Sequence, residues 1–184
     1  MKFYGLVFLS LFIVACKTTP SGPEPTALLE GVREPENNYV KIINAHTKFF
    51  RKYDGFYESF RGHATLITPE SQEAILRRRG SYLQWDEKKF QDERTKSQQE
   101  MAAKTSVFLQ FYTPDVEYND LNKVNSIWRV FLEIDGRKFE GKVRKATGKP
   151  IEFYSIYPKF DKFSLPYEIT FNVSTSDVIR HTTK

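Results

Sequence analysis

Two Asp-Gly dipeptides in this chain, Asp54-Gly55 and Asp135-Gly136, each stand between runs in which apolar and polar residues alternate. Asp-Gly suits the tight turn of a β-hairpin, because both central residues of a type I′ turn need positive φ. Alternation with a period of two places the apolar residues of each run on one face of a sheet. The sequence therefore predicts two antiparallel hairpins, each with one buried face.

The register of each hairpin follows from counting outward from its turn. In the first hairpin, which we expect over residues 39–68, the count pairs Tyr53 with Phe56 and places His46 opposite His63. In the second, the predicted pairs are Ile134 with Arg137, Leu132 with Phe139, Val130 with Gly141 and Trp128 with Val143. All the apolar members of the second hairpin share one face, and charged residues occupy the other.

Further strands and helices follow from periodicity and capping. We expect strands over 105–113, 151–157 and 166–174, with the first apolar on both faces and therefore central. A helix capped by Thr68, with Pro69 in its first turn, should run to about Arg79 and end at Gly80, and a second should run from about Asp86 to Lys104. The second helix is so polar that we expect it on the surface.

The order of these elements predicts the fold class and the domain limits. We expect a mainly β fold, an antiparallel β-sandwich (Ig-like or similar) over residues 39–175, with a helical insertion at about 69–104. The alternative is an α+β fold with helices on one face of an antiparallel sheet. Residues 176–184 are polar and are expected to form a disordered tail.

Composition narrows the class of protein further. The chain has 184 residues, 40% apolar and 15% aromatic, which is enough for one domain with a real core. Its formal charge of +5 is mild, and no basic patch accompanies a recognition helix, so we expect no nucleic-acid partner. A single cysteine, Cys16, excludes an intramolecular disulfide.

The first fifteen residues have the three parts of a secretory signal. Lys2 supplies a positive charge, residues 3–14 are mostly apolar, and the small residue Ala15 follows. The apolar run is too short to span a hydrocarbon core, which takes about 20 helical residues. Residues 16–38 contain four of the nine prolines, together with Thr, Ser, Gly and Glu, and are expected to act as a flexible tether.

The residues around the cysteine resemble a known processing site. Ile13-Val14-Ala15-Cys16 is similar to the lipobox of bacterial lipoproteins. The resemblance implies cleavage before Cys16, a diacylglyceryl group on its thiol and an acyl chain on the new amino group. Two or three acyl chains hold a protein firmly on a membrane. Lys17 stands where the family places Asp for inner-membrane retention, so the resemblance implies the outer membrane, with the inner membrane as the alternative.

The rest of the chain resembles uncharacterised envelope lipoproteins in a looser way. The similarity rests on Tyr112-Thr113-Pro114 after a strand, on Trp128 and on the late aromatic strand 167–171. It covers about a third of the chain and implies no activity.

Three groups of residues are candidates for a binding site. His46 and His63, if paired across the hairpin, could share a metal, although Lys48 opposite Arg61 would repel it; we expect no metal. The aromatic and basic stretch 152–171 could form a platform for an envelope lipid, glycan or peptide, or could simply fill the core; its candidate contacts are Tyr154, Tyr157, Lys159 and Lys162. The third candidate is a contact with anionic lipid through Arg77, Arg78 and Arg79, which point about 100° apart on a helix.

No catalytic motif accompanies these groups. The chain contains no GxSxG, SxxK or HExxH sequence, so we expect no catalytic residues and no cofactor beyond the covalent lipid. The first hypothesis is a lipid-anchored structural or protein-interaction module of the bacterial envelope, with an unidentified protein partner. The second is a binding module that uses residues 152–171, and the third is an enzyme of unrecognised type.

Overall fold

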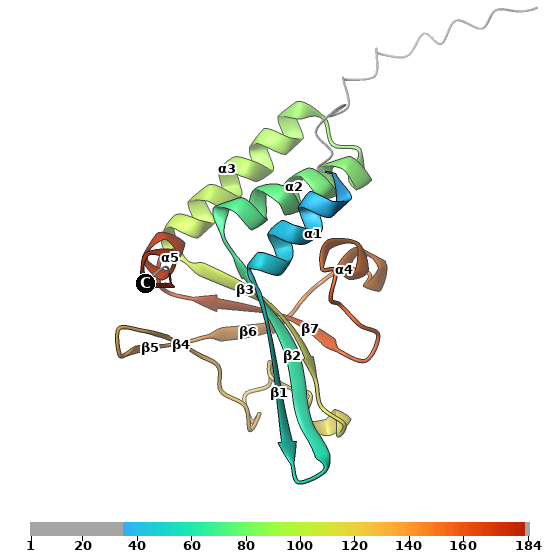
Figure 1. Ribbon diagram of the computed structural model, residues 1–184. Helices are drawn as coiled ribbons and strands as arrows, with labels where there is room; N and C mark the ends of the chain where they lie inside the picture. Colours follow the sequence, from blue (N-terminus) through green and yellow to red (C-terminus); the bar gives the residue numbers. More distant parts are fainter. Residues whose placement is uncertain (1–34, 183–184) are drawn as a thin grey trace, which may run out of the picture.

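The computed structural model describes residues 35–182, in which an antiparallel five-stranded sheet lies beside a layer of helices (Figure 1). The strand order is β1 (Thr47–Asp54), β2 (Tyr57–Ile67), β3 (Thr105–Tyr112), β7 (Leu165–Phe171) and β6 (Lys142–Lys145). β4 (Phe131–Ile134) and β5 (Arg137–Glu140) form a separate two-stranded hairpin. The helices are α1 (Glu36–Ala45), α2 (Pro69–Leu83), α3 (Glu87–Ala103), α4 (Pro150–Ile156) and α5 (Thr175–Thr182), with a short 3₁₀ turn η1 (Val116–Tyr118).

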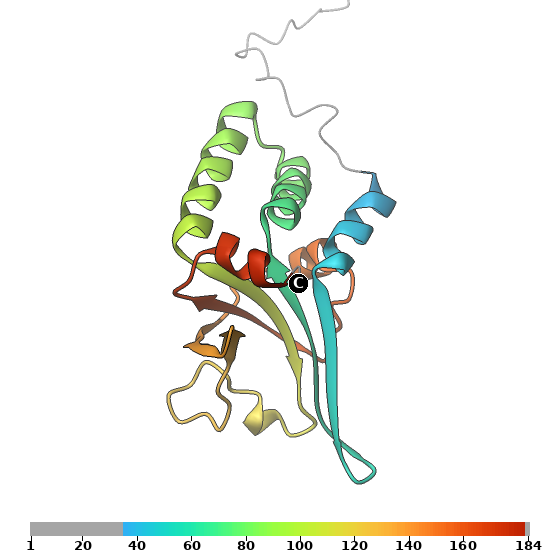
Figure 2. The same ribbon diagram turned by 60° about the vertical axis from the view of Figure 1, so that its left-hand side comes forward.

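The fold is α+β, which was the alternative prediction; the β-sandwich was wrong. Instead of a second full sheet, helices pack on one face of the sheet, and the β4–β5 hairpin with the segment before it covers the other (Figure 2). The reason is that two segments read as strands, 39–45 and 151–157, are helices. Without these two predicted strands, too few strands remain to form the second sheet of a sandwich.

Each face of the sheet has its own apolar core. The helix-side core contains Tyr39, Ile43, Ala74, Ile75, Phe108, Phe153, Ile156 and Tyr157. The core on the opposite face contains Leu109, Phe111, Leu121, Tyr167, Ile169 and Phe171. β3 contributes to both cores and lies third in the strand order, so the prediction of a central strand with two apolar faces is confirmed.

Two helices lie where strands were predicted. In α1, Tyr39 and Ile43 are four residues apart and fully buried, which is the spacing of one helical face. In α4, Pro150 occupies the first turn, and Phe153, Ile156 and Tyr157 share the buried face. Both runs are short and dense in apolar residues, and such runs fit a helix as well as a strand until tertiary contacts decide.

The first hairpin forms, but with a different register. Asp54 pairs with Tyr57, so Gly55 and Phe56 make the turn, and an irregularity follows between Lys52 and Tyr53. Gly55 has φ of +59°, as a tight hairpin turn requires. Beyond the irregularity Phe49 lies opposite His63, three positions from the predicted register. An odd shift exchanges the two faces of a strand.

The second hairpin has the predicted turn and register close to that turn. Ile134 pairs with Arg137, and Leu132 with Phe139. The Gly141 backbone N–H donates to the Val130 carbonyl oxygen at 2.8 Å, as that predicted pair implies. The chain then leaves the hairpin, and Val143 pairs with Ile169 of the large sheet rather than with Trp128. Gly141 makes this transfer feasible, because a Cβ there would lie 2.6 Å from the Ile169 Cγ2 atom.

The two consecutive helices begin where their caps predicted. The Thr68 hydroxyl accepts a hydrogen bond from the Ser71 backbone N–H, and the Asp86 carboxylate accepts one from Lys89. α2 does not end at Gly80, however: it continues to Leu83 and stops at Gln84, which has φ of +52°. Gly80 is buried inside the helix, and its carbonyl oxygen accepts the backbone N–H groups of Gln84 and Trp85 at the helix end.

The predicted disordered tail is folded at least to residue 182. α5 occupies 175–182, the side chain of Val178 is buried, and the Thr175 hydroxyl donates to the Lys104 carbonyl oxygen at 3.1 Å. These contacts hold α5 against the junction between α3 and β3.

The signal segment 1–15, Cys16 and most of the predicted tether lie outside the described residues. Between residues 35 and 182, none of the helices combines the length and apolarity that a bilayer span requires.

Candidate functional site

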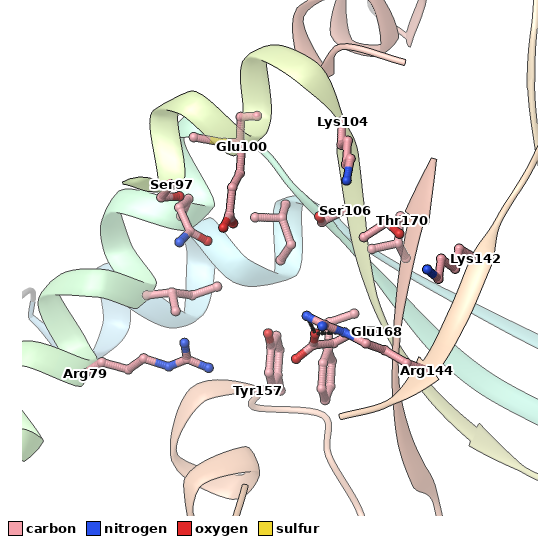
Figure 3. Close-up of a pocket in the computed structure, with 16 residues that line it drawn as sticks. Arg79, Ser97, Glu100, Lys104, Ser106, Lys142, Arg144, Tyr157, Glu168 and Thr170 are labelled. Atoms are coloured by element: carbon pink, nitrogen blue, oxygen red, sulfur yellow. Dashed lines mark hydrogen bonds and ion pairs between the residues drawn. The ribbon is translucent and has the colours of Figure 1, made fainter. Parts of the chain in front are cut away.

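A cleft of about 470 Å³ opens between the α2–α3 pair and the sheet (Figure 3). α2 and α3 supply one wall, and the helix-side face of β7 and β6 supplies the other. Along β6 and β7, every second side chain points away from the core on the opposite face of the sheet and toward the helices. The residues that line the cleft in this way are Lys142, Arg144, Glu168 and Thr170. The site therefore lies where the helix layer leaves the end of the sheet uncovered.

Four cationic side chains reach this cleft from different elements. They are Arg79 of α2, Lys104 at the end of α3, and Lys142 and Arg144 of β6. Arg144 is paired with Glu168 of the neighbouring strand, with its Nε 2.9 Å from the carboxylate. Within the described part of the chain, no carboxylate lies within ion-pairing distance of Arg79, Lys104 or Lys142.

Two acidic residues, Glu100 and Glu168, also line the cleft. Glu168 is occupied by Arg144, which leaves Glu100 as the other carboxylate of the cleft; Glu93 of α3 interacts with Arg79 from outside it but is already paired with Lys89. Figure 3 shows the Lys104 amine and the Glu100 carboxylate directed into the open space, and the Lys142 amine beside Thr170 at its edge. The cleft therefore carries an excess of positive charge that its own carboxylates do not neutralise.

The floor of the cleft contains two stacked aromatic rings. The ring of Tyr157 stacks on that of Phe108, with the two rings parallel and their centroids 3.5 Å apart. Burial raises the pKa of the Tyr157 hydroxyl well above its usual range, while the nearby Arg79 charge acts in the opposite direction. The phenol is therefore protonated at neutral pH and can offer a hydrogen bond, and Figure 3 shows its oxygen directed toward the cleft.

The two predicted metal-binding histidines do not meet. His46 caps α1, and its Nε2 atom lies 3.1 Å from the Glu70 carboxylate. His63 is on β2, where its ring lies 4.9 Å from that of Phe49. Burial lowers the pKa of His63, which keeps its imidazole uncharged at neutral pH. Among residues 35–182, no three His, Cys, Asp or Glu side chains are grouped closely enough for a metal. The pairing failed because the register is shifted: Phe49 lies opposite His63, and the His46 carbonyl oxygen accepts a hydrogen bond from the Leu66 backbone N–H at 2.9 Å.

The four predicted platform residues are divided between two environments. Tyr157 is buried in the cleft floor. Tyr154 is 42% exposed on α4, and Lys159 and Lys162 are exposed on the loop that follows. Phe153 is also buried in the core, so most of this aromatic stretch fills the interior, as the competing interpretation held. A single platform of Tyr154, Tyr157, Lys159 and Lys162 is therefore not formed.

The three consecutive arginines diverge, as the helical geometry predicted. Arg77 pairs with Glu73 one turn earlier, at 2.9 Å. Arg78 donates to the Ser155 carbonyl oxygen and pairs with Glu36, which ties α2 to α4 and α1. Arg79 alone of the three lines the cleft.

Sequence reasoning missed the other cleft residues, Lys104, Lys142, Arg144 and Glu168. One signal was available, because the alternating run Lys142-Val143-Arg144 places two cations on one face of a strand. What the sequence could not show is that this face lies beside α3, about 40 residues away along the chain.

Comparison of the chain with protein-family models, with curated proteins and with solved structures gives no match. The cleft therefore has to be interpreted from its own chemistry.

Proposed function

We propose that this chain is a bacterial envelope lipoprotein, anchored through lipid on Cys16, whose folded part is a non-catalytic module that binds a small anionic ligand in the cleft. The observation that carries the binding role is the convergence of Arg79, Lys104 and Lys142 on one cleft without carboxylate partners. These side chains stand around one cleft, and their summed positive potential attracts an anion into it.

The cleft residues favour a phosphate or carboxylate group. The planar Arg79 guanidinium can form two parallel hydrogen bonds to such a group, and the two lysines add point charges. The cleft also has the volume typical of a small-molecule site, and Ile67, Ile75 and Met101 supply apolar lining. A ligand with an anionic head and a short apolar part fits both features, and an acidic lipid of the envelope has that chemistry.

The anchor and the location are supported by the sequence. Ile13-Val14-Ala15-Cys16 follows an apolar run of signal-peptide length, and a Pro-rich segment separates it from α1. We propose the outer membrane as the location, with the inner membrane as the alternative. An anchored protein that meets its ligand at the membrane needs only modest affinity, because the tether keeps the local concentration high.

The test is a titration of the purified chain with dihexanoyl phosphatidic acid, followed by calorimetry or by chemical shifts of the cleft residues. We expect saturable binding that weakens with salt, and no binding of dihexanoyl phosphatidylcholine, whose head group has no net charge. Arg79→Gln should weaken binding about tenfold or more, since a charge-assisted hydrogen bond contributes about 1.5–3 kcal/mol.

Arg77→Gln is the matched control, because Arg77 lies on the same helix and is already paired with Glu73 outside the cleft. It should leave the affinity unchanged. Equal affinity of the parent chain and Arg79→Gln, or equal binding of both lipids, would refute the proposed role of the cleft.

A further inference from the structure

The β1–β2 hairpin ends in aromatic side chains that nothing in the described part of the chain covers. Phe56 and Tyr57 at the turn expose 102% and 83% of their reference surface areas, and Phe49 and Tyr53 on β1 are about half exposed. Both views of the fold show this end of the hairpin extending beyond the helices, on the side opposite to α1 (Figures 1 and 2). Exposed aromatic groups of this kind mark an interaction surface.

The exposed aromatic residues point in several directions. Phe49, Arg51 and Tyr53 share one face of β1, and the Arg51 guanidinium donates to the Tyr53 hydroxyl at 3.0 Å. Tyr57 is adjacent in sequence to Glu58, the partner of Tyr53, so it projects to the other face. Phe56 lies between them in the turn. The result is a knob with aromatic groups around it, rather than a flat patch on one side.

Basic residues stand immediately behind this aromatic tip. Residues 47–67 carry four basic side chains, Lys48, Arg51, Lys52 and Arg61, and two acidic ones, Asp54 and Glu58. The Glu58 carboxylate is shared between Arg51 and Arg61, at 3.0 and 2.5 Å. Lys48 and Lys52 then remain as cations set back from the turn, and Asp54 is the acidic residue nearest to it. The charge behind the tip is net positive.

We propose that the tip formed by Tyr53, Phe56 and Tyr57 inserts into the interfacial layer of a bilayer that contains anionic lipids. A fluid bilayer can surround a knob on all sides, whereas a rigid protein partner needs a groove of matching shape. Aromatic rings with polar edges concentrate at the level of the lipid head groups, and Lys and Arg behind them meet the lipid phosphates. This contact is separate from the ligand cleft.

A second copy of this chain is a poorer occupant than a bilayer. β1 is an edge strand, but three of its eight residues, Lys48, Arg51 and Lys52, are cationic. Charged side chains, lysine above all, discourage pairing between edge strands. The same three cations are favourable next to an anionic surface.

The predicted anchor is compatible with this contact. Nineteen residues, 17–35, lie between Cys16 and Glu36, and this segment could span about 65–70 Å if it were extended. α1 and β1 placed end to end measure about 40 Å. The tip can therefore reach the same bilayer that holds the lipid.

The experiment is a Phe56→Trp variant of the full chain added to vesicles that contain brominated lipids. The added tryptophan should shift to shorter emission wavelength and be quenched severalfold with phosphatidylglycerol present, and much less with phosphatidylcholine alone. The parent chain, measured in the same way, gives the background fluorescence of Trp85 and Trp128. Ile151→Trp is the matched control, because Ile151 is exposed on α4, away from the hairpin, and its signal should not change.

Two further variants make the outcome decisive. Phe56→Ser with Tyr57→Ser removes only exposed side chains, so the fold should persist while vesicle binding falls about tenfold or more. Lys48→Glu with Lys52→Glu should abolish the preference for phosphatidylglycerol. Absence of quenching at position 56 overturns the proposal, and so does a blue shift that depends on protein concentration without vesicles, which would identify a second copy as the occupant. The readout is local to the tip, so failure of the cleft or of lipidation would not imitate either result.

Discussion

The Tyr39 hydroxyl donates a hydrogen bond of 2.5 Å to the Ile156 carbonyl oxygen, joining α1 to α4 across 117 residues of sequence. Both groups are buried, and Arg78 lies over the Tyr39 ring, 4.1 Å from its centroid. This contact stabilises the two helices that replace predicted strands. It also positions α4, and therefore Tyr157, under the cleft.

Removing this hydroxyl should destabilise the domain. Tyr39→Phe keeps the ring but leaves the Ile156 carbonyl oxygen buried without its donor, so we expect a loss of about 1–3 kcal/mol in the free energy of unfolding. Urea denaturation measures the change. Tyr154→Phe is the control, because Tyr154 is exposed on the same helix as Ile156. A loss no larger than that of the control would show that the hydrogen bond contributes little.

Three buried tyrosines should make the fold sensitive to high pH. Burial raises the pKa of Tyr39 and Tyr157 well above the usual range and raises that of Tyr167 to about 12. The unfolded chain loses these protons near pH 10, while the folded chain keeps them. Stability is therefore fully present below about pH 10 and falls above it, by about 1.4 kcal/mol per pH unit for each group.

The measurement is the free energy of unfolding at several pH values above neutrality, in the parent and in Tyr167→Phe. The variant should show a shallower decline above pH 10, because one titrating group is gone. Tyrosinate absorbance gives an independent reading: if every tyrosine of the folded protein titrates together near pH 10, the interpretation of these buried phenols is wrong.

Gly141 should tolerate no side chain. A Cβ atom there would lie 2.6 Å from Ile169 Cγ2 and 2.8 Å from Phe171 Cε1. We expect Gly141→Ala to destabilise the fold by about 1–3 kcal/mol through overpacking, as measured by thermal or urea unfolding. Glu140→Ala, at the exposed neighbouring position, should have little effect. An unchanged stability of Gly141→Ala would mean that the chain does not approach β7 this closely.

The proposed anchor depends on one sulfur atom. Cys16→Ser should abolish lipidation, and the protein should either leave the membrane fraction or accumulate as the uncut precursor. Cell fractionation and mass spectrometry of the N-terminus measure these outcomes. Ser21→Cys in the Cys16→Ser background is the control, because a cysteine outside the lipobox should not restore processing. Normal processing and membrane retention without Cys16 would exclude lipidation at this residue.

Local sequence signals predicted much of the sheet and little of the site. Alternation located β3 and β7, Asp135-Gly136 located the second turn, and Thr68 and Asp86 located two helix starts. Of the residues proposed for binding, only Arg79 and Tyr157 reached the cleft. The other binding candidates were chosen from patterns among adjacent residues, whereas the cleft collects side chains from six separate elements, β2, α2, α3, β3, β6 and β7.

The sequence by itself determined the second turn at Asp135-Gly136, the caps of two helices and the strand that is apolar on both faces, since each depends on the φ, hydrogen bonding or periodicity of a few adjacent residues. Only the tertiary structure decided that 36–45 and 150–156 are helices, that His46 and His63 lie apart, and that Arg79, Lys104 and Lys142 converge. The two helices are selected by the burial of Tyr39 and Ile43 in one core with Phe153 and Ile156, residues more than 100 positions away. A short apolar run fits the periodicity of a helix as well as that of a strand, and the tertiary surface against which it is buried determines which of the two forms.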